Sequence, residues 1–239
     1  MIIHLIAFIL GAIIGSFLNC VIYRMEVKKS FIKGRSFCPH CKKELQWYDL
    51  IPILSFLFLG GKCRYCKKDI SIQYPLVELG TGLVFLLLSI TEMALLPFLV
   101  FPLLIVIFIY DLKHFIIPDS VIFPLIILSF FIHLKGDFIL SGFFAGFFFF
   151  LFWLLSKGKW MGFGDVKLAL FMGFFLGFPN IIVAMFTAFC SGAVIGLFLI
   201  LFKNKKLRSE VPFAPFLIFG TFIGFFFGSY LVNFYFSLL

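Results

Sequence analysis

Two aspartates, Asp111 and Asp165, are the residues of this sequence best suited to do chemistry. Asp111 directly follows the apolar run 97–110, and Asp165 ends the stretch 162–165, Gly-Phe-Gly-Asp, which opens a later apolar run. An ionisable group at hydrocarbon depth is costly, so each such residue is a functional-site hypothesis. The chain has only six Asp among 239 residues. These two predict a carboxylate pair that does acid–base work at a membrane surface.

Two carboxylates held together in a low-dielectric site share a proton, because they cannot both ionise easily. One can then deprotonate a water while the other protonates a carbonyl oxygen or a leaving amine. This is the chemistry of aspartic proteases, which needs neither a nucleophilic side chain nor a metal. We expect Gly162 and Gly164 to let the backbone turn sharply and to let a substrate strand approach Asp165.

Each acidic residue also has a structural interpretation. Asp165 could cap the helix that it opens, since Gly-Asp before an apolar run is a common helix start. Asp111 could pair with Lys113 or His114 as an interfacial anchor. Asp119 follows a proline, and we expect it to be an N-cap. The residues alone leave the catalytic and the structural interpretations of the pair open.

Four cysteines lie in the one stretch that is long enough to be a separate soluble unit, residues 24–73. They form two Cys-x-x-Cys pairs separated by 21 residues: Cys38, Cys41, Cys63 and Cys66. This spacing is typical of a tetrahedral four-thiolate zinc site. Disulfides or a redox pair are alternatives, although the topology expected below places the segment in a reducing compartment. A closed site leaves no open position for catalysis, so we expect the zinc to be structural and to supply folding energy.

The composition excludes an ordinary soluble domain, since 63% of the residues are hydrophobic and only 13% are charged. A membrane-spanning helix needs about 20 mostly apolar residues. The sequence therefore predicts an all-α polytopic membrane protein with about eight transmembrane helices and a small cytoplasmic zinc-ribbon-like insert; seven spans are the alternative. The expected helices cover 2–23, 75–91, 96–111, 117–134, 138–156, 165–178, 180–202 and 213–237. The first is expected to be retained, because it lacks the basic start and cleavage site of a signal peptide.

The basic residues predict the orientation, because Lys and Arg stay in the cytoplasm. Eleven of the 20 lie between Arg24 and Lys68, and others lie at alternate connections, including the segment 203–208. The opposite connections contain only Lys135. This pattern puts both termini outside and both aspartates at the cytoplasmic face. The net charge of +9 is then a topology signal with some attraction to anionic lipid, and it requires no nucleic-acid partner.

Further motifs follow in order along nearly the whole chain. They comprise Gly15-Ser16-Phe17-Leu18-Asn19, Tyr23-Arg24, both cysteine pairs, the segment 47–52, Tyr74-Pro75-Leu76-Val77-Glu78, Asp111, Ile117-Pro118-Asp119, the segment 162–168, and Pro212-Phe213-Ala214-Pro215-Phe216. In this combination the chain resembles the bacterial type IV prepilin peptidases, which belong to the GxGD class of intramembrane aspartic proteases. Ala214 stands where glycine is common in that family.

The resemblance implies that Asp111 and Asp165 are the catalytic pair of a bacterial inner-membrane enzyme. Such enzymes cut the positively charged leader from prepilins and pseudopilins at the cytoplasmic face. Many members also methylate the new α-amine with S-adenosylmethionine, and members with the cysteine insert are of this bifunctional kind. The sequence has no Rossmann-type glycine fingerprint, so it does not locate the cofactor site. Glu78 and Asp49 could contact the amine or the cofactor, with structural hydrogen bonding as the alternative.

The expected domains are a first transmembrane helix over 1–23, the four-cysteine insert over 24–73 and a transmembrane aspartic peptidase domain over 74–239. Two other functional classes remain as alternatives: a carboxylate-dependent transporter and a non-enzymatic scaffold for pilus or secretion assembly. A transporter would show helix-broken halves related by internal repetition, which the sequence does not show. A scaffold would tolerate Asn at positions 111 and 165.

Overall fold

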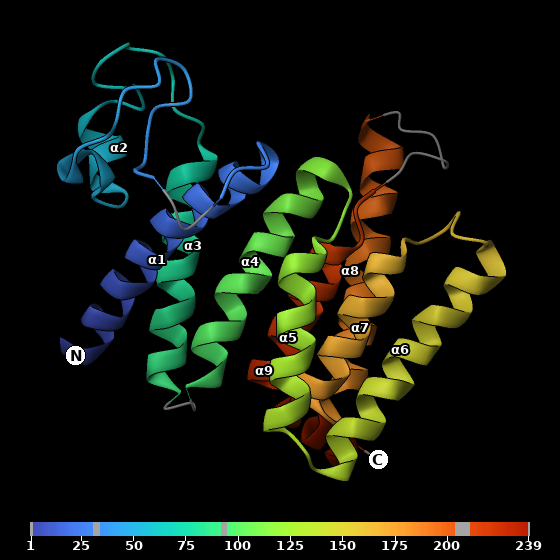
Figure 1. Ribbon diagram of the computed structural model, residues 1–239. Helices are drawn as coiled ribbons and strands as arrows, with labels where there is room; N and C mark the ends of the chain where they lie inside the picture. The colour runs from blue at the N-terminus through green and yellow to red at the C-terminus, as the bar shows by residue number, and fades with distance from the viewer. Residues whose placement is uncertain (1, 31–33, 92–94, 204–210, 239) are drawn as a thin grey trace. The chain divides into compact units, whose positions relative to one another are not determined.

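The protein is almost entirely helical. The computed structural model describes residues 2–30, 34–91, 95–203 and 211–238, and this part of the chain is 75% helix without strands (Figure 1). Its helices are α1 (Ile2–Glu26), the 3-10 helix η1 (Trp47–Leu50), α2 (Leu54–Phe58), α3 (Gln73–Ile90), α4 (Leu96–His114), α5 (Asp119–Ile132), α6 (Gly136–Ser156), α7 (Phe163–Leu176), α8 (Asn180–Lys203) and α9 (Ala214–Ser237).

All eight helices that the apolar runs predict are present, so the expectation of an all-α membrane protein is confirmed. Six of them are long and apolar enough to cross a membrane. Helices α5 and α7 have 14 residues each, a length of about 21 Å against a hydrocarbon core of about 30 Å. The number of eight spans is therefore approximate.

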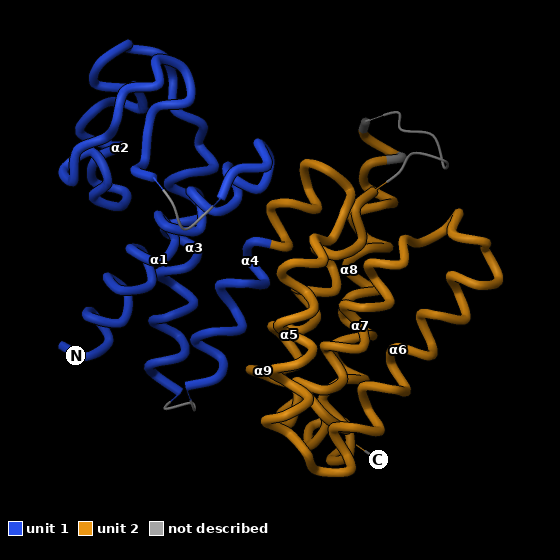
Figure 2. The backbone as a smooth tube through the Cα atoms, in the orientation of Figure 1, with its two compact units in different colours: residues 1–106 blue, residues 107–239 orange. Residues whose placement is uncertain are grey.

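The chain divides into two compact units, residues 1–106 and 107–239 (Figure 2). The division falls within α4, and the first unit contains α1, the cysteine insert and α3. The sequence predicts domain boundaries after residues 23 and 73, and these boundaries stay a prediction.

In the first unit, glycines bring α1 and α3 close together. A Cβ added to Gly15 would lie 2.7 Å from the Cα of Glu78, and one added to Gly11 would lie 2.7 Å from the Cβ of Phe85. Small residues allow such backbone approach between membrane helices, where packing and hydrogen bonding drive association. The insert leaves the end of α1 and returns at the start of α3, so this helix pair carries it.

In the second unit, α7 is the central helix, with α5, α6, α8 and α9 all in contact with it. Ten of its 14 residues are buried. Helix α6 approaches it through glycines, since a Cβ on Gly142 would collide with the ring of Phe174 and one on Gly146 would lie 3.0 Å from Leu170. Gly142 and Gly146 therefore permit close packing of α6 on α7. The inner helix α7 is held by protein rather than by lipid.

In the second unit, basic residues are more numerous at one end of the helices than at the other. Helices α4 and α6 end, and α7 begins, on the same side of this unit, at the top of Figure 1. Lys113, Lys157 and Lys159 lie at these ends, whereas the connection between α5 and α6 contains Lys135. The basic residues at 205, 206 and 208, which the orientation argument also used, lie outside the described residues.

Candidate functional site

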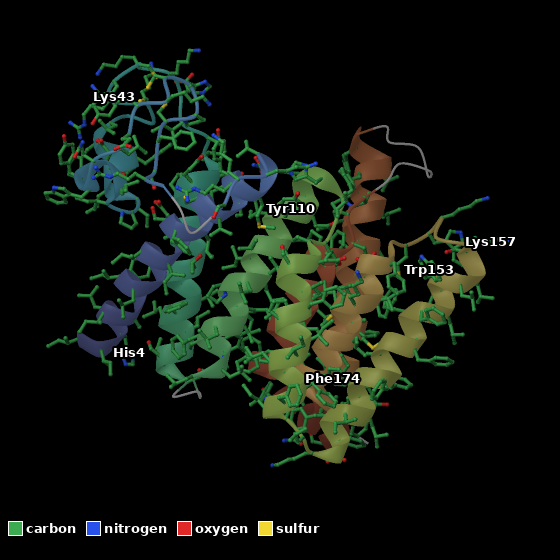
Figure 3. The ribbon with its side chains drawn as sticks, viewed as in Figure 1. His4, Lys43, Tyr110, Trp153, Lys157 and Phe174 are labelled. Atoms are coloured by element: carbon green, nitrogen blue, oxygen red, sulfur yellow. The ribbon has the colours of Figure 1, made fainter. Side chains whose placement is uncertain are left out.

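Asp111 lies in the last turn of α4, directly after Tyr110, which Figure 3 labels near the upper end of that helix. It is only 5% exposed. Its carboxyl group accepts a hydrogen bond from the backbone N–H of Ala214, the first residue of α9. Its Oδ2 atom is buried and has no hydrogen-bond partner among the described residues. A buried polar atom of this kind has capacity left for a water or a substrate group.

Asp165 lies in the first turn of α7 and is 8% exposed. The structural interpretation of Asp165 as an N-cap is wrong in position, because the helix begins at Phe163 and Gly162 is the N-cap. Asp165 is instead the third helical residue, and its Oδ2 accepts the backbone N–H of Gly162 at 3.2 Å. The carboxylate therefore satisfies one free N–H at the start of its own helix.

The two carboxyl groups interact electrostatically, so the structure brings the predicted pair together within the second unit. Each also receives a backbone N–H from the N-terminal end of a helix, α9 for Asp111 and α7 for Asp165. The positive end of a helix dipole favours negative charge. Two buried carboxyl groups, with the Oδ2 of Asp111 buried and without a partner among the described residues, can bind a water and exchange protons with it.

The two glycines beside Asp165 differ in their surroundings. A Cβ on Gly162 would meet only Asp165 Oδ2 at 3.8 Å and the Gly164 nitrogen at 3.9 Å, so this position is open. A Cβ on Gly164 would lie 3.0 Å from the Cβ of Ile117, so that space is filled by the connection between α4 and α5. Gly162 has an ordinary negative φ of −75°, and Gly164 is not among the glycines with positive φ. A sharp turn is therefore not the reason for glycine at either position.

Asp119 is not the N-cap that the sequence predicts. Pro118 holds that position, and Asp119 is the first residue of α5. Its Oδ1 lies 2.6 Å from the Nζ of Lys167 on α7. The Lys167 ammonium also lies over the rings of Phe123 and Phe163, 4.9 and 5.4 Å from their centroids. This group connects α5 to the first turns of α7, two residues from Asp165.

The four predicted cysteines form one cluster in the insert. Their sulfurs all lie within 4.8 Å of one another, and Cys38 Sγ is 3.9 Å from Cys66 Sγ. All six cysteines of the chain are free. A tetrahedral zinc–thiolate site has Zn–S bonds of about 2.3 Å, which implies sulfur–sulfur separations of about 3.8 Å. The cluster therefore fits a zinc ion, and neighbouring His40 is exposed and not part of it.

The two cysteine pairs have the same backbone geometry. The N–H of Cys38 bonds the Lys43 carbonyl at 2.9 Å, and that of Cys63 bonds the Lys68 carbonyl at 2.8 Å. The residue after each second cysteine has a positive φ, +61° at Lys42 and +59° at Lys67. Each pair is thus a tight turn that presents two sulfurs to one point.

These turns also assist ionisation of the thiols. Burial raises the pKa of Cys63, but the N–H groups of Cys66 and Tyr65 donate to its sulfur and lower its pKa to about 7. Burial raises the pKa of Cys38 to about 11, against the N–H groups of its own turn. A bound cation would supply the positive charge that stabilises both thiolates.

Asp49 has a structural role in the insert. Its side chain is 3% exposed and accepts hydrogen bonds from Arg64 Nε at 2.7 Å, Tyr65 Oη at 3.1 Å and the Gln46 N–H at 3.2 Å. Burial opposes its ionisation, but these donors lower the pKa of Asp49 below its ordinary value. It ties η1 to the second cysteine pair. Of the two roles considered for Asp49, these contacts support structural hydrogen bonding.

Glu78 is held in the same way within the first unit. It is buried in α3, and its Oε2 accepts the backbone N–H of Ile53 at 2.7 Å, with a further hydrogen bond from the Ser16 side chain. These contacts join α1, α3 and the residue that precedes α2. They support the structural alternative for Glu78 as well.

Two features of these sites escaped the sequence reasoning. The Ala214 N–H at Asp111 is a backbone group, and only its place after Pro212-Phe213 in an ordered motif could have pointed to it. Arg24 is 4% exposed, and its guanidinium donates to the carbonyls of Ser30, Gly34 and Arg35. It therefore organises the start of the insert, whereas the sequence analysis included Arg24 as a topology signal and as part of a family motif without a structural role.

Comparison with protein families gives two matches that together cover most of the chain. Residues 9–91 match the bacterial peptidase A24 N-terminal domain, and residues 98–197 match the type IV leader peptidase family. The first match contains the cysteine cluster, and the second contains both Asp111 and Asp165.

Several curated proteins are similar over nearly their whole length, and each has the name prepilin leader peptidase/N-methyltransferase. The protein of Bacillus subtilis (strain 168) is 34% identical, over 96% of this chain and 96% of its own. That of Aeromonas hydrophila is 30% identical, over 96% and 92%, and that of Legionella pneumophila is 28% identical, over 97% and 94%. No solved structure matches this chain.

Proposed function

This chain belongs to the type IV leader peptidase family, and from that premise we propose that it is a membrane-embedded aspartic endopeptidase that removes the leader from prepilins or pseudopilins. The observation that carries the proposal is the buried pair of Asp111 and Asp165, which interact with each other and each accept a backbone N–H. The relatives' shared name supports the substrate class.

The pair would work as a general base and a general acid. The ionised carboxylate takes a proton from a water, whose oxygen attacks the carbonyl carbon of the scissile peptide bond. The protonated carboxyl donates its proton to the carbonyl oxygen, which gives a tetrahedral diol. Collapse of this diol breaks the C–N bond, and the leaving nitrogen takes a proton from the pair. The unpaired Oδ2 of Asp111 is the atom best suited to hold the water.

Substrate access would come at Gly162. This position is open, and its N–H already bonds the Asp165 carboxylate. A side chain there would stand between an extended substrate and the pair. Gly164 contributes differently, because its missing side chain admits Ile117 against the first turn of α7.

We further propose that the active site faces the cytoplasm across a bacterial inner membrane. The basic residues at the ends of α4 and α6, on the side where α7 begins, support this orientation, since cytoplasmic connections carry excess Lys and Arg. A prepilin would place its apolar helix in the bilayer and its charged leader on that side.

The insert over residues 24–73 would hold a structural zinc through Cys38, Cys41, Cys63 and Cys66. Zinc would stabilise the four thiolates and thereby fold the segment. The relatives' name also supports N-methylation of the new terminus, for which S-adenosylmethionine would supply the methyl group. The described residues do not locate that cofactor. The carboxylates of Glu78 and Asp49 already accept structural hydrogen bonds, so their contacts do not support a role in binding it.

The test is cleavage of a prepilin by the purified chain in vesicles, with D111N and D165N made separately. Loss of one member of an acid–base pair is expected to lower kcat by roughly 100- to 10,000-fold. The exposed Asp137 at the start of α6 provides the matched control, and D137N should cleave normally. Near-normal cleavage by either active-site variant would refute the catalytic assignment of that aspartate. No cleavage by the unchanged chain would favour a non-enzymatic scaffold.

A further inference from the structure

The short helix α2 turns an apolar face outward from the insert. Leu54, Leu57 and Phe58 are 51%, 65% and 86% exposed. They are spaced i, i+3 and i+4, which places them on one side of the helix. Phe56 points the other way, since a Cβ on Gly61 would lie 3.2 Å from its ring. The outward side of α2 is therefore entirely apolar.

Membrane-spanning helices expose apolar side chains to lipid, but α2 has five residues and is not a span. It belongs to the segment between α1 and α3, where exposed apolar residues, Leu50 and Ile51, precede it and exposed lysines follow it. Single exposed apolar residues are ordinary, whereas several on one face indicate an interaction surface. Trp47 of η1, the element in contact with α2, is 75% exposed as well.

A hydrogen bond holds the start of α2 beside α3. The N–H of Ile53, the residue before α2, bonds Glu78 Oε2 at 2.7 Å. Glu78 lies five residues after the first residue of α3, about 7.5 Å along a helix that is long and apolar enough to span the membrane. Ile53 has a φ of +60°, which a β-branched residue adopts only where its surroundings hold it. The start of α2 is thus held beside the first turns of a membrane helix.

The interfacial region of a bilayer occupies about 5–8 Å on each side of the hydrocarbon core, and an element held beside the first turns of a spanning helix lies near this region. The charge around α2 suits the same place. Lys62 is exposed and follows Phe58 by four residues, and Lys67 and Lys68 are exposed as well. Leu and Phe side chains flanked by lysines are typical of helices that lie in the membrane interface and attract anionic lipid.

We propose that α2 is an interfacial anchor for the insert: the face formed by Leu54, Leu57 and Phe58 lies in the boundary between headgroups and acyl chains, beside α3, and the neighbouring lysines bind anionic headgroups. The anchor holds the four-cysteine cluster against the membrane. It does not depend on the peptidase assignment, because it rests on the insert and α3 alone.

The test places the photoreactive residue p-benzoyl-phenylalanine at position 58 of the full chain in vesicles of phosphatidylcholine and phosphatidylglycerol. Mass spectrometry after illumination identifies what it has captured. The control position is Lys43, which lies on the side of the insert remote from α1 and α3 (Figure 3). Lipid adducts are expected at position 58 and not at position 43, and L54D/L57D should greatly reduce those at 58. Zinc content, measured in parallel, should not change.

Other outcomes overturn the proposal in identifiable ways. No lipid capture at position 58 would place the face in water, and equal capture at both positions would show that α2 is no deeper in the membrane than the rest of the insert. Capture of added prepilin or of a second copy in place of lipid would make α2 a protein docking site. Unchanged capture in vesicles without phosphatidylglycerol would remove the role of the lysines and leave only the apolar anchor.

Discussion

A backbone amide completes the surroundings of the proposed acid–base pair. Asp111 accepts the N–H of Ala214 on α9, and its other oxygen is free for a water. The family resemblance marked Ala214 only as a departure from glycine, a change that leaves the N–H in place. The side chain at position 214 is therefore less important than the amide beneath it.

Replacing Ala214 by lactic acid, which exchanges the amide for an ester, tests this amide. A hydrogen bond to a charged group contributes about 1.5–3 kcal/mol, so we expect kcat for leader cleavage to fall about ten- to hundredfold. The matched control replaces Phe216 by phenyllactic acid, which keeps the side chain and removes an N–H that bonds the Phe213 carbonyl at 3.0 Å. This control should leave kcat nearly unchanged. Equal losses at both positions would mean that the ester merely weakens the start of α9.

Asp49 joins η1 to the second cysteine pair through its hydrogen bonds, and D49N should loosen this connection. The donors around Asp49 lower its pKa in the folded protein, so its contribution to stability is full above its unfolded pKa of about 3.9. That contribution disappears as the pH falls through the folded value. Amide exchange over residues 46–65 should therefore be faster in D49N at neutral pH and converge with the unchanged protein in acid. A constant difference at all pH values would exclude the ionised carboxylate as the cause.

Among the elements, the packing of α7 against α6 depends on glycines, which have no side chain. A Cβ on Gly173 would collide with the carbonyl of Ser141 and lie 2.5 Å from the Cα of Gly142. Because these are backbone atoms, α6 would have to move as a whole. The pairing of α6 with α7 is thus determined by close backbone approach, which also positions the first turn that carries Asp165.

We therefore expect G173A to destabilise the protein by about 1–3 kcal/mol, the usual cost of overpacking. Gly196 in α8 is the matched control, since a Cβ there would meet nothing within 4 Å. G196A should be neutral or stabilising by up to about 1 kcal/mol, because Ala favours helix. Thermal unfolding in one detergent compares the two variants, and equal stability would refute a tight contact at Gly173.

Sequence periodicity predicts the long helices well and the short elements poorly. Runs of apolar residues predicted all eight helices of 14 or more residues, because lipid demands continuous hydrogen-bonded helix. The start of α7 was predicted at Asp165 instead of Phe163, since Gly-x-Gly resembles a loop, although Phe163 and Gly164 are helical here. Helix α2 and the bond from Ile53 to Glu78 were not predicted. They depend on a tertiary contact over 25 residues that no local pattern records.

At the scale of the whole molecule, the zinc-type cluster and the aspartate pair lie in different compact units. Each unit has its own close helix contacts, through Gly15 in the first and Gly142 in the second. Because each site lies within one unit, the cysteine spacing and the acidic motif could be recognised separately in the sequence. Metal loss should therefore act locally.

Zinc removal with a strong chelator, or C63S, is expected to unfold the insert, because small zinc peptides draw about 10–16 kcal/mol from metal binding. Amide exchange should then rise over residues 34–72 and stay unchanged over α7. Metal analysis of the untreated chain should give one zinc per chain. Exchange that rises equally in α7 would show that the metal stabilises both units.

The bond from Ala214 to Asp111 also has a consequence for biosynthesis. A ribosome makes Asp111 and Asp165 well before it makes α9 (Ala214–Ser237), so a growing chain has both carboxyl groups but lacks the amide that fixes the first. The proposed catalytic pair is therefore complete only when the last helix has been made. We expect a half-made chain to cleave neighbouring nascent membrane proteins more slowly than the finished chain does, so the order of synthesis would itself limit premature cleavage.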